Sequence, residues 1–90
     1  MNISLSSSFA FNVLPHKEKL RLVVIKDEQE FVCRIENRKN LNQFIANEYA
    51  SIFKGRLQLI KDKEDVFVQV KGEIIGKISK NIFEKSLTVA

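Results

Sequence analysis

Apolar residues at helical spacing predict one amphipathic helix in the middle of the chain. Over residues 41–53 they recur at intervals of three and four, which places them on one helical face. Asn40 is suited to cap the start of this helix, and Gln43 three residues later completes a capping box. Gly55 is suited to end it, because glycine readily adopts the left-handed conformation that follows a last helical turn. The residues on the apolar face are Leu41, Phe44, Ile45, Tyr49, Ile52 and Phe53.

Apolar and polar side chains that alternate with a period of two predict strands on both sides of this helix. Short polar loops between the strands favour antiparallel hairpins. We therefore expect a single α+β domain at residues 9–90, with a mostly antiparallel sheet in the order β-β-α-β-β-β-α and the long helix packed on one sheet face. Residues 1–8 are expected to form a flexible N-terminal tail or a frayed edge strand. The expected strands cover residues 19–25, 30–36, 56–60, 66–70 and 73–78, an extended segment covers 9–14, and a short C-terminal helix carries Ile82, Phe83 and Leu87.

The same alternation predicts which side chains face the core. In the strand at residues 30–36, Phe31, Cys33 and Ile35 are expected to point inward, opposite Val32 and Arg34. A two-residue turn at Lys71-Gly72 would place Phe67 opposite Gly76 in the last hairpin.

The last strands are apolar on both faces, so their second face needs cover. We expect that cover from the C-terminal helix, from the segment at residues 9–14, or from a second chain.

Composition adds a charge bias to this picture. Fifteen Lys and Arg residues against eleven Asp and Glu give a net charge of +4 and a pI near 9.4, which favours an anionic partner such as nucleic acid. A single cysteine excludes a disulfide or a Cys-based zinc site within one chain and fits a reducing cytoplasm. No apolar run approaches the ~20 residues of a membrane-spanning helix, and the N-terminal residues lack the early positive charge of a signal peptide. We expect a cytoplasmic protein without membrane contact.

Residues that often carry catalysis occur here without the partners they need. His16 lies at a segment boundary, with no sign of an orienting carboxylate or a nucleophile. Cys33, on the expected core face, is interpreted as a small apolar residue. The acidic stretches at residues 27–30 and 62–65 lack the ligand spacing and the glycine of a calcium loop. We therefore expect a binding module rather than an enzyme, with no cofactor and no metal.

Two groups of residues are candidates for binding nucleic acid or another anion. The first lies at the start of the central helix, where Arg38, Lys39 and Asn40 would meet the free amide groups of the first turn. The second consists of Arg21, Arg34 and Lys77, which would align across the sheet if the strands pair as expected. The first function that we expect is therefore that of a small nucleic-acid-associated or regulatory module.

The alternative function is a protein–protein interaction module, acting as a homodimer, an inhibitor or a subunit of a larger complex. It rests on the apolar residues Phe9, Phe11 and Phe67, which lie in segments that need cover. Sequence alone leaves both functions open, and only the positive charge favours nucleic acid.

Overall fold

The computed structural model describes all 90 residues and contains two four-stranded antiparallel sheets and two helices. The first sheet, in the order β1-β2-β3-β4, consists of β1 (Asn2–Ser4), β2 (Phe9–His16), β3 (Lys19–Lys26) and β4 (Gln29–Glu36). Helix α1 (Arg38–Ala46) follows it. The second sheet consists of β5 (Tyr49–Ile52), β6 (Leu57–Asp62), β7 (Asp65–Val70) and β8 (Glu73–Ser79), in that order, and α2 (Lys80–Val89) ends the chain. Neither helix has the length and apolar character that a membrane crossing requires.

The two halves of the chain share one architecture, a four-stranded meander followed by a helix, although their sequences show no clear repeat. In each half the last hairpin turn has a positive φ at both turn residues, Asp27 and Glu28 in one and Lys71 and Gly72 in the other. Each of these hairpins then has a β-bulge after two residue pairs. The bulged residues, Phe31 and Ile75, both pack against the core. The two meanders therefore have the same local geometry as well as the same order of strands.

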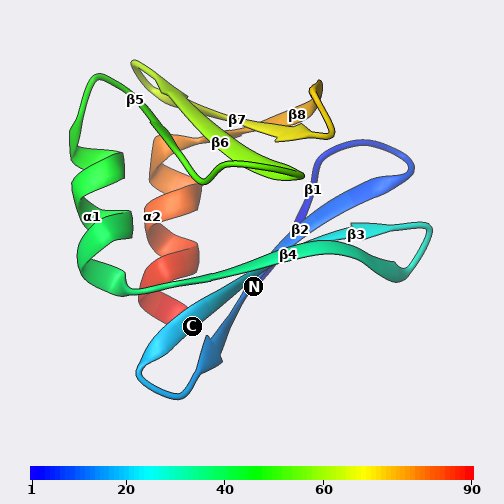
Figure 1. The fold of residues 1–90 in the computed structure, drawn as a ribbon, viewed down its shortest axis with the longest axis horizontal. Coiled ribbons are helices and arrows are strands. Elements are labelled where there is room, and N and C mark those ends of the chain that lie inside the picture. The colour runs from blue at the N-terminus through cyan, green and yellow to red at the C-terminus, as the bar shows by residue number, and fades with distance from the viewer.

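The inner faces of the two sheets enclose the core, and the helices close one end of it. Figure 1 shows α1 and α2 side by side at one end of the sheets, with the β3–β4 and β7–β8 turns at the other. Phe83 of α2 is fully buried, and its ring lies 6.1 Å from that of Phe11 and 6.2 Å from that of Phe44. These three rings join both helices to the first sheet. The remaining core residues include Leu20, Leu22, Val24, Leu57, Leu59, Val66 and Val68.

The expected single long helix is not confirmed, because the helix ends at Ala46 and a strand follows. Asn37, rather than Asn40, caps the helix by accepting a hydrogen bond from the amide of Asn40. Asn47 is already extended, with φ −82° and ψ 144°. In β5, Ala50 and Ile52 pack against the core while Tyr49 and Ser51 are exposed. Apolar residues that fit a helical period thus also fit a strand, and pairing with β6 favours the strand.

From Val32 onward, the core face of β4 is the reverse of the expected one. The bulge at Phe31 places Val32 opposite Val24, and Val32 is buried while Cys33 and Ile35 are exposed. Arg34 lies on the inner face, where its guanidinium sits 5.1 Å from the centre of the Phe53 ring. One inserted residue in the ladder thus reverses the alternation that the sequence pattern predicts.

Gly76 is also paired differently from the expectation. A second bulge places Gly76 opposite Val68, while Phe67 pairs with Lys77. Leu5, just after β1, covers this glycine, and a Cβ atom added at Gly76 would lie 2.8 Å from the Cβ of Leu5. The first residues of the chain therefore form an edge strand of the first sheet, and Leu5 contacts the second sheet.

Cationic side chains from other elements stabilise the C-terminal ends of both helices. The guanidinium of Arg38 in α1 donates hydrogen bonds to the carbonyls of Leu87 and, at 2.8 Å, of Ala90 at the end of α2. Lys61 of β6 is buried and donates to the carbonyl of Asn47 at the end of α1, at 2.9 Å. Positive groups at these ends satisfy carbonyls that lack helical partners and oppose the negative end of the helix dipole.

We predict that Arg38→Met lowers the free energy of unfolding by about 1–2 kcal/mol, because two carbonyls of α2 lose a charged donor. Urea unfolding followed by circular dichroism would measure the change. Lys39→Met is the matched control. This substitution removes the same charge one residue away, and the Lys39 side chain makes no hydrogen bond or ion pair. Equal stability of the two variants would contradict a capping role for Arg38.

Candidate nucleic-acid interface

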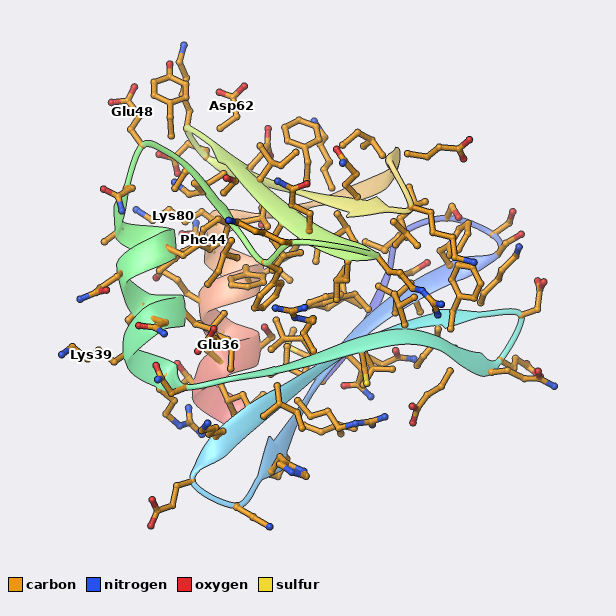
Figure 2. The ribbon with its side chains drawn as sticks, viewed as in Figure 1. Glu36, Lys39, Phe44, Glu48, Asp62 and Lys80 are labelled. Atoms are coloured by element: carbon orange, nitrogen blue, oxygen red, sulfur yellow. The ribbon has the colours of Figure 1, made fainter.

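The start of α1 is already occupied by side chains of this chain. Glu36 accepts hydrogen bonds from the amide of Asn37 at 2.9 Å and from the side chain of Asn40 at 3.0 Å, through one carboxylate oxygen. Asn37 itself accepts from the amide of Asn40, and Arg38 is turned toward α2. Among the predicted anion-binding residues here, only Lys39 points freely into solvent (Figure 2). Two amides that a bound phosphate could use, those of Asn37 and Asn40, are thus engaged within the protein.

The structure does not align Arg21, Arg34 and Lys77. Arg21 pairs with Ile35 and Arg34 with Leu22, so the two arginines lie on opposite faces of the first sheet. Lys77 lies in the second sheet, 3.7 Å from Asp65.

Arg21 forms an ion pair with Glu30 on the outer face of the first sheet. The hydrogen bond from Arg21 lowers the pKa of the Glu30 carboxyl below its usual value. Of the three predicted cations, only Arg34 is free of an acidic partner.

Arg34 instead belongs to a basic hollow between β4 and the β5–β6 connection. This hollow has a volume of about 370 Å³, and its lining includes Phe31, Arg34, Lys54 and Arg56. The guanidinium of Arg34 donates a hydrogen bond to the carbonyl of Lys54 at 3.1 Å. The carbonyl of Arg56 in turn accepts from the amide of Lys71 at 2.8 Å, which links the hollow to the β7–β8 turn.

Two further lysines reach the hollow over the ring of Phe31. The ammonium group of Lys26 lies 5.1 Å from the ring centre, and that of Lys71 lies 4.7 Å from it. Both distances fall within the range of cation–π attraction. Phe31 is half-buried, and the two exposed lysines show that part of its ring meets the surface rather than the core. We call the hollow with these two lysines the basic groove; it comprises Lys26, Phe31, Arg34, Lys54, Arg56 and Lys71.

The positive charge of the protein is concentrated in the basic groove. All five of its cations are exposed, and none takes part in the three ion pairs of the structure. Outside the groove, the other ten Lys and Arg residues are balanced by eleven Asp and Glu residues. Unpaired charges grouped around a concave surface attract anions more strongly than the same number spread over the molecule.

Most of the basic groove could not be predicted from the sequence. Its cations come from segments that are far apart in the sequence, so only the tertiary fold brings them together. These segments are the end of β3 with Lys26, the β5–β6 connection with Lys54 and Arg56, and the β7–β8 turn with Lys71. Phe31 packs against the core as expected, and part of its ring also lines the groove. The one signal in the sequence was the pair Lys54 and Arg56 around Gly55, which has a positive φ of 96° and was expected to end a helix.

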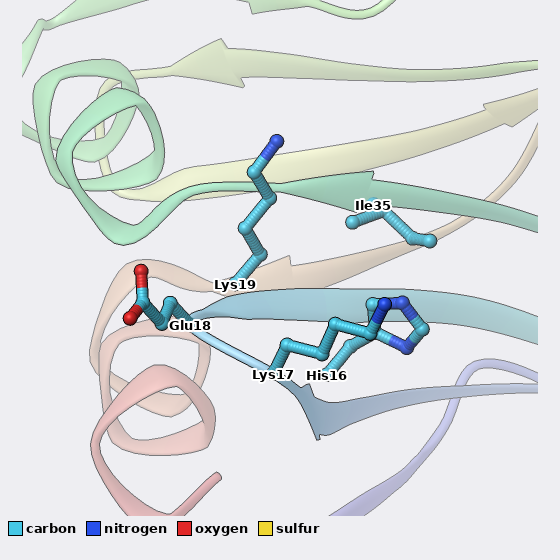
Figure 3. A pocket seen from close by; sticks show the side chains of 5 residues that line it. All are labelled: His16, Lys17, Glu18, Lys19 and Ile35. Atoms are coloured by element: carbon cyan, nitrogen blue, oxygen red, sulfur yellow. The ribbon is translucent and has the colours of Figure 1, made fainter.

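A larger hollow, of about 590 Å³, lies beside the β2–β3 turn. Its lining is His16, Lys17, Glu18, Lys19 and Ile35. Figure 3 shows that their side chains point in different directions rather than toward a common centre. His16 makes no side-chain hydrogen bond, and no group of three or more His, Cys, Asp or Glu residues is placed to hold a metal ion. We therefore find no arrangement here that favours catalysis.

The residues predicted to form a protein interface are not brought together. Phe11 is fully buried in the core, and Phe9 is half-buried beside Phe31, with ring centres 6.3 Å apart. Phe67 lies on the outer face of the second sheet, opposite Ile60, and Tyr49 and Ile74 lie on the same face. Neither a helix nor the segment at residues 9–14 covers this face (Figure 1), because both lie on its inner side.

Comparison of the chain with protein-family models, with curated proteins and with solved structures found no match.

Proposed function

We propose that this protein is a small, non-enzymatic module that binds nucleic acid in the basic groove. The observation that carries the proposal is the set of five exposed, unpaired cations around one hollow that also contains an aromatic ring. Phosphate groups would be neutralised by Lys54, Arg56 and Lys71, and Arg34 would add a planar guanidinium. The proposed binding requires no metal or cofactor. A cytoplasmic location agrees with the single exposed thiol of the protein, Cys33.

This groove replaces the helix start as the proposed anion site. Arg38 and Asn40 are engaged in hydrogen bonds that hold the fold, so recruiting them would break those bonds. The groove cations, in contrast, are free of carboxylate partners. When these cations bind phosphate they release water and counterions, and no ion pair within the protein has to break.

We predict that Lys54→Gln combined with Arg56→Gln weakens binding to an oligonucleotide by about ten-fold or more at low salt. Each lost phosphate contact should also reduce the slope of log affinity against log salt by about one, so the pair reduces it by about two. Fluorescence anisotropy at a series of salt concentrations would measure both quantities.

The matched control is Lys39→Gln combined with Lys85→Gln, which removes the same charge from exposed, unpaired positions on the two helices. At about 0.1 M salt this control should change binding by less than about two-fold, because charges far from the groove are screened there by a Debye length of ~10 Å. Equal weakening by both pairs would mean that net charge, not the groove, determines binding.

A second candidate function, association of two copies, is supported by the outer face of the second sheet. Tyr49 and Ile74 are 61% and 51% exposed there, and Phe67 and Ile60 are half-buried between them. The same face carries Asp65 and Lys77, so it has charges of both signs. A two-fold axis through such a face would pair apolar residues with apolar residues and opposite charges with each other.

For this second function we predict a dimer whose mass falls to that of a monomer when Tyr49→Ser and Ile74→Ser are combined. Light scattering coupled to gel filtration would measure the mass. The control is Leu14→Ser with Ile35→Ser, which removes exposed apolar residues from the outer face of the first sheet. A monomeric unmodified protein at a concentration of several hundred micromolar would exclude this function.

A further inference from the structure

We infer that the basic groove accepts single-stranded nucleic acid in preference to a duplex, with Phe31 as a stacking platform for a base. The inference deepens the proposed function and rests on it. Its basis is the position of one aromatic ring among five cations, together with the charges of the elements that surround the groove.

The elements near the groove are poorly suited to reading a duplex. A major groove admits a helix or a two-stranded ribbon. Both helices lie at the opposite end of the molecule from the β3–β4 and β7–β8 turns (Figure 1). The ribbon formed by β3 and β4 carries the unpaired carboxylates of Asp27 and Glu28 at its tip, and these would repel the phosphates on both sides of a major groove.

The position of Phe31 fits a base that is not stacked inside a duplex. The bulge leaves Phe31 without a partner on β3 and turns its ring toward the groove. Aromatic rings in cationic grooves bind single strands by stacking on the faces of bases. In a duplex those faces are covered by neighbouring base pairs, so Phe31 would have no partner there.

For a base to stack on Phe31, the side chains of Lys26 and Lys71 must move off its ring. In the free protein their ammonium groups lie over the Phe31 ring, and both side chains are exposed and long enough to move. When a strand enters, each ammonium can pass from the ring to a phosphate oxygen. The ring is then free for the base, and the backbone is held on both sides of it.

Four fluorescent probes test the inference on the unmodified protein: a DNA strand of about twelve nucleotides, the RNA of the same sequence, the corresponding DNA duplex, and a DNA strand of equal length without bases. We expect the base-bearing single strands to bind about ten-fold more tightly than both the duplex and the abasic strand. The comparison of DNA with RNA shows which sugar is preferred. Duplex binding equal to or tighter than single-strand binding would overturn the inference.

Phe31→Leu tests the ring directly, with Phe67→Leu, a half-buried aromatic in the second sheet, as the matched control. Phe31→Leu should weaken binding of the base-bearing strands by about ten-fold, leave the abasic strand unchanged and keep the salt dependence the same. Equal effects on base-bearing and abasic strands would overturn the role of Phe31. If Phe31→Leu does not fold, as a thermal melt would show, the four-probe comparison still decides between single strand and duplex.

The same experiments separate this inference from the proposed function. If no probe binds at low salt, the proposed function itself is wrong. If all probes bind equally and the Lys54 and Arg56 variants weaken every one of them, the groove binds nucleic acid but does not select single strands.

Discussion

The packing of Phe83 against Phe11 and Phe44 is the interaction on which the rest of the structure depends. The inner face of each sheet is strongly apolar, and two such faces can be buried only against each other or against helices. Phe83 links the last helix to the first sheet and to α1, so the two halves of the chain form one core. Because both helices fill the same end of this core, the opposite end is formed by strands and turns alone.

That asymmetry explains where the basic groove lies. At the end away from the helices the inner faces are lined by half-buried residues such as Leu5, Phe9 and Phe31. Long cationic side chains can cover such apolar surface with their stems while their charged groups stay in water. Lys26 and Lys71 do this over Phe31, and Arg34 does it over Phe53. The groove is therefore a product of how the core is closed, and the proposed function uses cations that no carboxylate neutralises.

Local patterns identified the strands β2, β3, β4, β6, β7 and β8 and the second helix, because these segments have strong periodicity and clear turn residues. They failed where two structures share one pattern, as in β5, whose Tyr49 and Ile52 suit both a helix and a strand. They also failed beyond the two bulges, at Cys33, Ile35 and Gly76, since a bulge depends on the partner strand. For the groove, Arg34 was predicted as a binding residue, while Lys26, Lys54, Arg56 and Lys71 are brought together only by strand pairing and sheet packing.

The most direct test of this account is to map the binding surface by NMR, titrating the ¹⁵N-labelled protein with an unlabelled single-stranded oligonucleotide. The account predicts that the largest shift changes cluster at Lys26, Phe31, Arg34, Lys54 and Lys71, while the amides at the start of α1 stay unchanged. Shift changes centred on Arg38 to Asn40, or on Tyr49 and Ile74, with the groove unaffected, would contradict it.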